Sequence, residues 1–479
     1  MTQAVNGVAT TYARGSAARR KRLFLGIVAL LGCAGAEAAN TFTVTSCTDT
    51  GPADTGNLRN SISMAADGDT VDAGGLINCP NSKITLALGQ IPIAVNNLMI
   101  AGSFNFLTGQ TLIVDGQGNG QNGMFRHAGT GTLTVSSLIL DHGYVTNNTQ
   151  AAKGGAIYSA GAVSLRSVSI YRSFANTVTG KAYGGAVYDK AGFNATYGVF
   201  AQNKAVAQNA AGTSLGGAIF SNGVMTLTYA TVSGNGAYSP SDNGGSFGGI
   251  DSNGSTFIQN STISGNTAHA HVGGLGVFGK PLGNLTLIDS TISGNTATKG
   301  PIGGVWAYTG NVSMTNPTIV HNTAGMGSFN GGPLYAPGLA VSYAYLSMTN
   351  ALIANNGYGA TLMQNDLTLG RNGMLKTIQN NLVRTTAVAL PPDTKKGVCP
   401  LLGPLRNNGG VTKTHALLSH SPAIDAGVAT ARNEDQRGKQ FDVMPPFPFP
   451  RQSGAATDIG AYEVEQNDIV FNTSFEGCP

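Results

Sequence analysis

The 479-residue sequence has few charged side chains: Asp, Glu, Lys and Arg make up 10% of it, and the net charge is +4. Soluble domains typically carry about 25% charged residues. Five of the basic residues lie within the first 22 positions, so the rest of the chain is close to neutral. This balance argues against a basic surface for nucleic acid, and we expect no nucleic-acid partner.

Cysteine is also scarce, with five residues and no C-x-x-C pair, so no zinc-binding pattern is present. If Cys33 leaves with an export signal, four cysteines remain. An even number in an exported chain indicates disulfides. We favour Cys47–Cys79 and Cys399–Cys478 among the three pairings, although the sequence alone does not select them. Free cysteines are the alternative.

Long apolar runs are absent after residue 36, so we expect no transmembrane segment in the mature chain. The N-terminus has the basic, apolar and small-residue order of a secretory signal: ARRKR (18–22), LFLGIVALLGCAGA (23–36) and AEA (36–38). We therefore expect residues 1–38 to be a signal peptide that is cleaved near Ala38. The segment LLGC (30–33) resembles a lipobox, and lipidation at Cys33 is the alternative.

Glycine is abundant, with 68 residues, and it marks a repeat of about 30 residues. The segment STISGNTA occurs at 261–268 and again at 290–297. Six units open with a Gly-Gly pair, and the first glycines are Gly154, Gly184, Gly216, Gly248, Gly273 and Gly303. Each unit continues with a strand of alternating polarity and then an asparagine: Asn176, Asn203, Asn235, Asn266, Asn295 and Asn322.

The alternation of period two predicts β-strands, and the repeat length is typical of a solenoid. The unit is too short for a four-stranded propeller blade and lacks a leucine ladder. We therefore predict an all-β fold, a right-handed parallel β-helix of about ten coils with N- and C-terminal caps. Stacked coils would place the six asparagines over one another as a hydrogen-bonded ladder.

The predicted organisation follows from where the repeat is recognisable. Residues 39–97 are expected to form an N-terminal cap and the first strands, and residues 98–397 the β-helix. Residues 398–465 are expected to form a C-terminal closure, and residues 466–479 a tail that is a candidate sorting signal.

The GGAI and S-x-NTA rhythm resembles that of bacterial β-helix proteins with polymorphic-outer-membrane-type repeats, which have a pectin lyase-like fold. The ending resembles the choice-of-anchor Q group in NNGGVTKTHALLSHSPAIDAG (407–427), DQRG (435–438) and DIGAYE (458–463). These resemblances imply an exported protein, secreted or associated with the outer membrane or cell surface. They imply no reaction.

Acidic residues are rare in the repeats: only Asp189, Asp242, Asp251 and Asp289 lie between residues 153 and 325. Glycoside hydrolases need paired carboxylates, and calcium-dependent lyases need a carboxylate cluster with a base. The nearest candidate is DHG at 141–143, which we interpret as a strand followed by a turn. We assign no catalytic, cofactor-binding or metal-binding residue and expect no cofactor.

Two further polar sets have structural interpretations. The C-terminal set is Asp425, Asp435, Arg437, Asp458 and Glu463, which we interpret as turn caps and an ion pair rather than a metal or active site. His269 and His271 would face the same side of an extended strand. Without a carboxylate partner they fit a solvated loop better than a metal site.

Aromatic residues follow the Gly-Gly pairs in several units: Tyr158, Tyr188, Phe220, Trp306 and Tyr308. They could stack on sugar rings, although packing is the commoner role. We expect a monomer that acts in adhesion or in glycan or surface binding without catalysis, with a polysaccharide or a host or cell-surface ligand as its partner. The alternative is a polysaccharide lyase or glycoside hydrolase on the same scaffold.

Overall fold

The computed structural model divides the chain into residues 1–38 and residues 39–479. It describes residues 39–51, 54–105, 109–118, 123–209, 212–240, 245–279, 283–325, 336–358, 363–440 and 447–465. The expected signal peptide with Cys33 and the expected tail with Cys478 lie outside the described residues. Among those residues, none of the helices has the length and apolarity that a membrane crossing requires.

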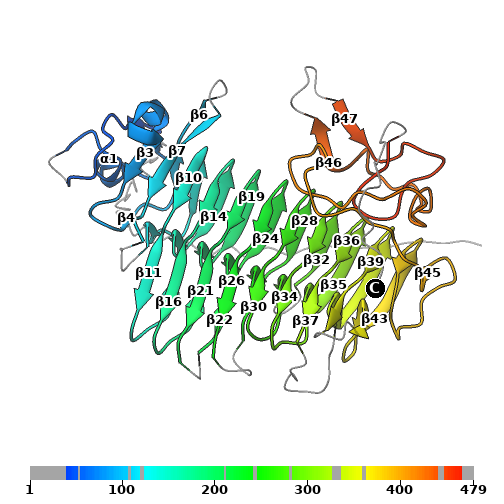
Figure 1. The fold of residues 1–479 in the computed structure, drawn as a ribbon. Helices are drawn as coiled ribbons and strands as arrows, with labels where there is room; N and C mark the ends of the chain where they lie inside the picture. The colour runs from blue at the N-terminus through cyan, green and yellow to red at the C-terminus, as the bar shows by residue number, and fades with distance from the viewer. Residues whose placement is uncertain are drawn as a thin grey trace, which may run out of the picture. The chain divides into compact units, whose positions relative to one another are not determined.

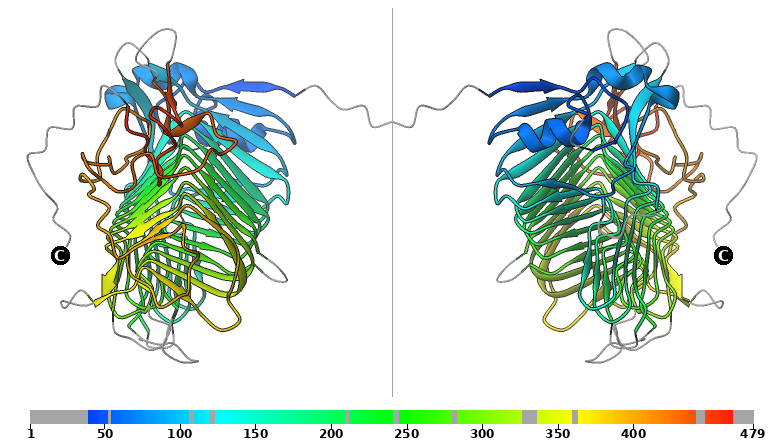
Figure 2. Two further views of the ribbon diagram at one scale, coloured as in Figure 1. Left: turned by 90° about the vertical axis from the view of Figure 1, so that its right-hand side faces the viewer. Right: turned by 90° about the vertical axis from the view of Figure 1, so that its left-hand side faces the viewer.

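Residues 39–465 contain a parallel β-solenoid of about ten turns, which confirms the predicted fold class. Figure 1 shows the strands of successive coils side by side, and Figure 2 shows the coils superimposed along their axis. One coil runs through β13 (Ile157–Ser159), β14 (Ala162–Arg166), β15 (Ser169–Tyr171), β16 (Phe174–Thr177) and β17 (Ala182–Tyr183). Each strand pairs in parallel with its equivalent in the next coil.

The largest sheet, sheet 1, has two columns of strands that both include the long strands β35 (Val305–Thr315) and β38 (Leu339–Thr349). The other strands of the first column are β4 (Ile91–Ile93), β8 (Phe125–His127), β13, β18 (Val187–Asp189), β23 (Ile219–Ser221), β27 (Ile250–Ser252), β31 (Leu275–Val277) and β42 (Leu367–Leu369). The other strands of the second column are β1 (Thr41–Thr43), β2 (Thr70–Asp72), β5 (Leu98–Ala101), β9 (Thr132–Ser136), β14, β19 (Gly192–Thr196), β24 (Val224–Thr228), β28 (Thr256–Gln259), β32 (Leu285–Ile288) and β43 (Met374–Gln379).

Three further sheets complete the coils. Sheet 2 contains β3 (Lys83–Thr85), β7 (Gln110–Asp115), β10 (Leu138–Asp141), β15, β20 (Val199–Ala201), β25 (Thr231–Ser233), β29 (Thr262–Ser264), β33 (Thr291–Ser293), β36 (Thr318–Val320), β39 (Leu352–Ala354), β44 (Leu382–Val383) and β45 (Lys395–Lys396), with β6 (Phe104–Asn105) paired to β7. Sheet 3 contains β11 (Tyr144–Asn147), β16, β21 (Lys204–Ala207), β26 (Gly236–Tyr238), β30 (Thr267–Ala268), β34 (Thr296–Ala297), β37 (Thr323–Ala324), β40 (Gly357–Tyr358) and β41 (Met363–Gln364). Sheet 4 contains β12 (Ala152–Lys153), β17 and β22 (Ser214–Leu215).

The core is a narrow column of inward-facing apolar side chains. In sheet 2, one inward position of each coil is apolar and buried: Leu140, Ile170, Phe200, Val232, Ile263, Ile292, Ile319, Ile353 and Val383. Ile263 and Ile292 are the isoleucines of the two STISGNTA copies, and they pair directly. The identical words therefore fill identical places in neighbouring coils.

A buried asparagine ladder runs along the bend between sheets 2 and 3. The side-chain nitrogen of Asn203 donates to the Asn235 oxygen at 3.0 Å, and the same bond recurs from Asn235 to Asn266 at 2.9 Å and from Asn266 to Asn295 at 2.8 Å. Asn295 donates to Asn322 at 2.9 Å. Each amide also donates to a strand carbonyl, so that its buried N–H groups are satisfied.

The ladder extends beyond the predicted asparagines at its C-terminal end. Asn322 donates to Asn356, and Asn356 donates at 2.8 Å to the carboxylate of Asp366. Every side-chain amide of the ladder donates to the next residue toward the C-terminal end. The last residue of the ladder therefore has to accept a hydrogen bond but not to donate one. A carboxylate meets that need because it is an acceptor without N–H groups when it is ionised.

Asn176 does not belong to the ladder, which corrects one of the six predicted positions. It pairs with Val206 in sheet 3, and Ser173 occupies the ladder position, its backbone N–H donating to Asn203. The reason is the register. The structure places equivalent residues of these two coils 30 positions apart, and the 27-residue step from Asn176 to Asn203 breaks that spacing.

The glycine pairs are also shifted by one residue partway along the repeats. Gly216 and Gly217 are followed by Ala218, and the backbone N–H of Ala218 bonds to Gly249, so that Gly217 rather than Gly216 is equivalent to Gly248. A side chain is excluded at Gly217, because its Cβ would lie 2.0 Å from the Gly248 carbonyl oxygen. Gly216 has a φ of +68°, which favours glycine for a different reason.

The bend between sheet 1 and sheet 2 is a second site of repeated conformation. One residue per coil has a left-handed backbone there, and from the middle of the solenoid it is mostly Asn or Asp: Asn260, Asp289, Asn316, Asn350 and Asn380. The Asn316 side chain bonds to Asp289 at 2.7 Å, and Asn350 bonds to Asn316 at 3.0 Å. These residue types tolerate the left-handed region and can pass hydrogen bonds along the axis.

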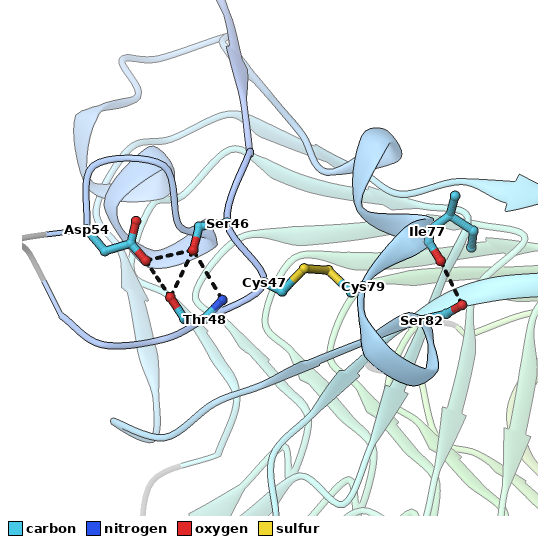
Figure 3. The surroundings of a disulfide bond; sticks show 7 residues. All are labelled: Ser46, Cys47, Thr48, Asp54, Ile77, Cys79 and Ser82. Atoms are coloured by element: carbon cyan, nitrogen blue, oxygen red, sulfur yellow. Dashed lines mark hydrogen bonds between the residues drawn. A yellow bond between two sulfur atoms is a disulfide. The ribbon is translucent and has the colours of Figure 1, made fainter.

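The N-terminal segment contains α1 (Leu58–Met64), η1 (Gly74–Asn78) and η2 (Pro80–Ser82) beside the first strands. The predicted disulfide Cys47–Cys79 is present, with the two Cα atoms 5.7 Å apart (Figure 3). It joins the chain before α1 to the end of η1 and so closes the segment that precedes the regular coils. Cys399 is also disulfide-bonded, and the predicted partner Cys478 lies outside the described residues.

The segment after residue 398 lies along the side of sheet 2, rather than only closing the end of the solenoid as its position in the sequence suggested (Figure 1). An apolar cluster joins Leu402, Leu417, Ala423 and Ile459 to the outward side chains of β36, β39 and β44. Further along, Gln436 bonds to Thr262 and Thr291. The antiparallel hairpin of β46 (Glu434–Gln440) and β47 (Phe447–Pro450) belongs to this segment.

We predict that Asn266→Ala lowers the free energy of unfolding by about 3 kcal/mol, because it leaves several buried backbone and amide groups without partners. Asn176→Ala is the matched control, since Asn176 lies outside the ladder and accepts only one bond, from Gln208. It should cost less than about 1 kcal/mol. Urea titration measures both, and equal midpoints for the two variants would contradict a stabilising role of the ladder.

Candidate functional site

The most promising surface lies where sheet 4 meets the first column of sheet 1. Outward side chains of β12, β17 and β22 face those of β13, β18 and β23, and isolated bridges at Phe247, Val272, Ile302 and Ala336 continue the sheet 4 side. We call this angle between the two sets of strands the corner. Because each coil repeats the same turn, the corner extends along the axis and collects one side chain per coil from each wall.

One wall of the corner carries a stack of aromatic rings. Tyr158 lies over Tyr188 at a centroid distance of 5.4 Å, and Tyr188 lies over Phe220 at 5.3 Å, with 3° between the planes in both pairs. Tyr183 on the other wall packs edge-on against Phe220 at 4.7 Å. The stacking follows from the parallel register, which places these three rings in the same column.

Most of the predicted sugar-contact aromatics are buried. Tyr188, Phe220 and Trp306 expose 5%, 4% and 3% of their surface, whereas Tyr158 and Tyr308 are half-buried. Trp306 belongs to a second apolar cluster in the corner with Phe247 and Ile302. The three buried rings are therefore packing residues, and Tyr158 is the member of the stack that presents surface to a ligand.

Two cations flank the exposed end of the stack. The Arg126 guanidinium carbon lies 4.4 Å from the Tyr158 ring centroid, and the Lys153 ammonium lies 5.0 Å from the Tyr188 ring and 5.8 Å from that of Tyr183. Arg126 precedes Tyr158 in the column, as their strand pairing requires. These cation–π contacts hold Arg126 at the end of the aromatic stack and Lys153 beside its middle ring, Tyr188.

The same residues line a cleft of about 390 Å³. Its polar lining residues are Gln90, Arg126, Thr146, Asn147, Gln150, Lys153 and Tyr158. None of the residues described as lining it carries a carboxylate. The cleft thus offers two positive charges, a set of amide groups and one half-exposed ring, which suits a ligand that has both an anionic group and a sugar face.

The acidic residues of the repeats do not reach this cleft. Asp189 points into the core, where the Ser221 hydroxyl donates to it at 3.1 Å, and burial raises its pKa to about 7. Asp289 is buried and its carboxylate lies 2.6 Å from Arg432. Asp242 lies outside the described residues.

Asp251 occupies the corner itself, in the column between Phe220 and Gly276. It exposes 3% of its surface, and its Oδ1 atom has no hydrogen-bond partner. Burial raises the pKa of this carboxyl group to about 8. It is therefore mostly protonated at neutral pH, and apolar packing rather than a charge partner surrounds it.

The DHG segment lies in an ion-pair network on the outside of sheet 2. His142 Nδ1 lies 3.4 Å from carboxylates of both Asp115 and Asp141, Arg172 binds Asp141, and Lys83 lies 3.0 Å from Asp115. Burial raises the pKa of Asp115, but hydrogen bonds from the Gln117 backbone and from Lys83 more than offset it, so the pKa lies below its usual range. A glycosidase acid needs the opposite, a raised pKa.

Four members of the C-terminal polar set are buried and Asp425 is exposed, and their contacts are in line with the structural interpretation of the set. Arg437 pairs with Asp435 at 2.9 Å and lies 4.1 Å from the ring centroids of both Phe449 and Tyr462. Arg451 lies 3.1 Å from the Glu463 carboxylate. The remaining two acids accept backbone hydrogen bonds: the Asp458 carboxylate accepts from the backbone N–H of Asp425, and the Asp425 carboxylate accepts from that of Ala456.

The two histidines of HAH lie in different surroundings. His269 packs edge-on against Tyr238 on the outside of sheet 3. His271 lies near Trp306 in the corner, and burial lowers its pKa to about 4. Within the residues that the structure describes, no group of three or more His, Cys, Asp or Glu side chains could hold a metal ion.

The sequence did not identify Arg126 and Lys153 as site residues. Arg126 lies in a coil before the first Gly-Gly pair, where the repeat is too degenerate to align by eye. Its strand pairing shows a 32-residue step to Tyr158, and counting back by one repeat from Tyr158 would have found it. Lys153 precedes Gly154 directly, but no pattern indicates that it turns toward the aromatic column.

No family model, curated protein or solved structure matches this chain. A proposal for the function of this chain therefore has to be argued from its fold and from the geometry of the cleft.

We predict that Asp251→Asn stabilises the protein, and that the gain depends on pH. Folded Asp251 keeps its proton up to about pH 8, whereas the unfolded chain loses it near pH 4, so the stability of the native protein falls as pH rises through this window. Asparagine cannot ionise and escapes this loss. The free energies of unfolding of the variant and the native protein, measured by urea titration, should coincide near pH 4 and differ by on the order of 2 kcal/mol at pH 7. A constant difference at both values would contradict the burial of a protonated carboxyl group.

Proposed function

We propose that this chain is an exported β-helix protein that binds an anionic glycan in the corner cleft without cleaving it. The observation that carries the proposal is a cleft of about 390 Å³ lined by Arg126, Lys153 and the half-exposed Tyr158, with Arg126 over the Tyr158 ring and Lys153 over the neighbouring Tyr188 ring. Arg126 and Tyr188 cover the two faces of the Tyr158 ring, so a sugar can pack against the exposed edge of this ring while its carboxylate or sulfate group bonds to the two cations.

The absence of a free acid–base pair supports binding without catalysis. Among the residues described at the cleft none is acidic, and the nearest carboxyl groups in the corner column are buried or face the core. Glycoside hydrolysis needs two carboxyl groups on either side of the bond, and a lyase needs a base beside an acidified carbon. The alternative function, a carbohydrate-active enzyme, has no such constellation at this cleft.

Export and family membership belong to the same proposal. The signal-like N-terminus and the Cys47–Cys79 disulfide both fit an oxidising compartment outside the cytoplasm. The GGAI rhythm and the segments at 407–427 and 458–463 resemble polymorphic-outer-membrane-type repeats and the choice-of-anchor Q ending. We infer a secreted or cell-surface protein whose glycan partner is a component of its surroundings.

The test is calorimetric titration of the full chain with trigalacturonate and with its neutral methyl ester. We expect the acid to bind and the ester to bind at least about tenfold more weakly, because a charge-assisted contact is lost. The double variant Arg126→Gln/Lys153→Gln should lose the preference for the acid. Raised salt should weaken binding of the acid to the native protein, since the cleft is open to solvent.

The matched control is Arg166→Gln/Lys190→Gln, which removes the same charge from exposed positions outside the cleft. It should bind trigalacturonate as the native protein does. Equal losses in both double variants would mean that net charge, rather than the cleft, attracts the ligand. The same mixtures are assayed for new reducing ends and for unsaturated products, and depolymerisation would overturn the non-catalytic assignment.

A further inference from the structure

A second surface with binding features lies on the outside of sheet 3. The parallel register aligns one outward position of each coil into a column: Tyr144, Phe174, Lys204, Gly236, Thr267, Thr296 and Thr323. The inward neighbours in the same strands are small and buried, such as Ala175, Ala205 and Ala237. The column is therefore the outer face of a flat, tightly packed ladder.

Two hollows occupy this face and share one lining residue. The first, of about 520 Å³, is lined by Tyr144, Phe174, Arg172 and Lys204, and the second, of about 440 Å³, by Lys204, Tyr238 and Thr267 among others. Because Lys204 lines both hollows, they lie next to each other along the face. We call the combined hollow the lateral groove.

The groove exists because side chains are missing at its centre. Gly234 lines the first hollow and Gly236 the second, whereas the preceding coil carries Gln202 and Lys204 at the equivalent positions. A Cβ built on Gly236 would meet its nearest atoms, Lys204 Cγ and the Thr267 carbonyl oxygen, only at 3.8 and 3.9 Å. Backbone packing therefore does not demand glycine at position 236, and its effect is to leave space.

The walls present rings and hydroxyl groups, and their charge is nearly balanced. Tyr144 and Phe174 stack at 5.3 Å with 17° between their planes, and Tyr238 is exposed further along the groove. Arg172 is also exposed, but its guanidinium is paired with the Asp141 carboxylate, which leaves Lys204 as the cation of the described lining that has no ion pair. No residue described as lining either hollow is acidic. Rings, hydroxyls and low charge suit an uncharged sugar chain.

The axial repeat of the groove matches an extended polymer. Strands of a sheet are spaced by about 4.8 Å, so the five steps from Tyr144 to Thr296 cover about 24 Å. The spacing of about 4.8 Å between coils is comparable to the length that one sugar adds to an extended glycan. Successive sugars would therefore meet successive coils. A compact ligand would use only one of the two hollows and would leave the rest of the column empty.

We propose that the lateral groove binds a linear, uncharged polysaccharide segment that lies parallel to the solenoid axis. The site is separate from the corner cleft in its residues and in the charge of its ligand. Together the two sites allow one chain to hold two glycan segments, and such bivalence raises the overall affinity for a polysaccharide surface.

The test measures binding of cellohexaose, xylohexaose and mannohexaose to the full chain by calorimetry. We expect at least one of them to bind, and its dimer to bind at least about tenfold more weakly because it spans a single hollow. Gly236→Tyr fills the groove and should weaken hexasaccharide binding by at least about tenfold. Trigalacturonate binding at the corner cleft should be unchanged in this variant.

The matched control is Gly75→Tyr, which places the same side chain at an exposed glycine with no atom within 4 Å of its Cβ. It should bind the hexasaccharide as the native protein does. If Gly236→Tyr fails to fold, Thr267→Tyr serves the same purpose, because Thr267 is exposed and lines the second hollow. The proposal is overturned if none of the three hexasaccharides binds, or if a folded groove-filling variant binds with native affinity. Failure of the native chain to bind trigalacturonate would instead contradict the corner cleft, and it would leave the lateral groove untouched.

Discussion

Parallel hydrogen bonding between successive coils is the constraint on which the rest of this structure depends. It fixes each residue opposite its equivalent one repeat later, so that every side chain has a like-placed neighbour on both sides along the axis. One inward position of sheet 2 is therefore apolar in every coil from Leu140 to Val383. The same constraint explains why a substitution in one coil is felt in the next, since no side chain packs only against its own coil.

Polar groups obey the same rule with an added condition of direction. Each buried amide of the ladder accepts a hydrogen bond from the preceding asparagine and donates one to the next, so it needs an acceptor in the next coil. The ladder that begins at Asn203 therefore ends without an unpaired N–H group when its last residue only accepts. Asp366 supplies it, receiving both the backbone and side-chain N–H groups of Asn356. Asp251 is the contrasting case. It stands in an aromatic column with no donor facing its Oδ1 atom, and burial raises its pKa instead.

The repeat made the solenoid predictable, because identical words such as STISGNTA carry both the strand period and the bend. The repeat did not determine the register between coils. Asn176 matches the repeat in the sequence but lies three residues after the ladder position. Gly216 aligns with Gly248 in the sequence, whereas in the structure Gly217 is the residue equivalent to Gly248. The corner cleft was further out of reach. Tyr158 stood out beside its glycine pair, whereas Arg126 lies in a coil without one, and the side on which Lys153 lies depends on a turn that its sequence does not specify. The contacts of the C-terminal segment with sheet 2 join residues more than 100 positions apart, such as Gln436 and Thr291, and no local pattern records them.

A solenoid with so narrow a core can carry function only on its outward columns, and these columns differ in what they can do. Where the two walls of the corner meet, large side chains cover one another. Tyr188, Phe220 and Trp306 are therefore buried, and Tyr158 at the end of the stack is half-exposed. Where the wall is flat, as on sheet 3, small residues leave the surface open along several coils. Binding a polymer needs the same contact repeated at a fixed interval. Repetition at the interval of the coils is what this architecture supplies, and it is the basis on which we propose that the protein holds long chains.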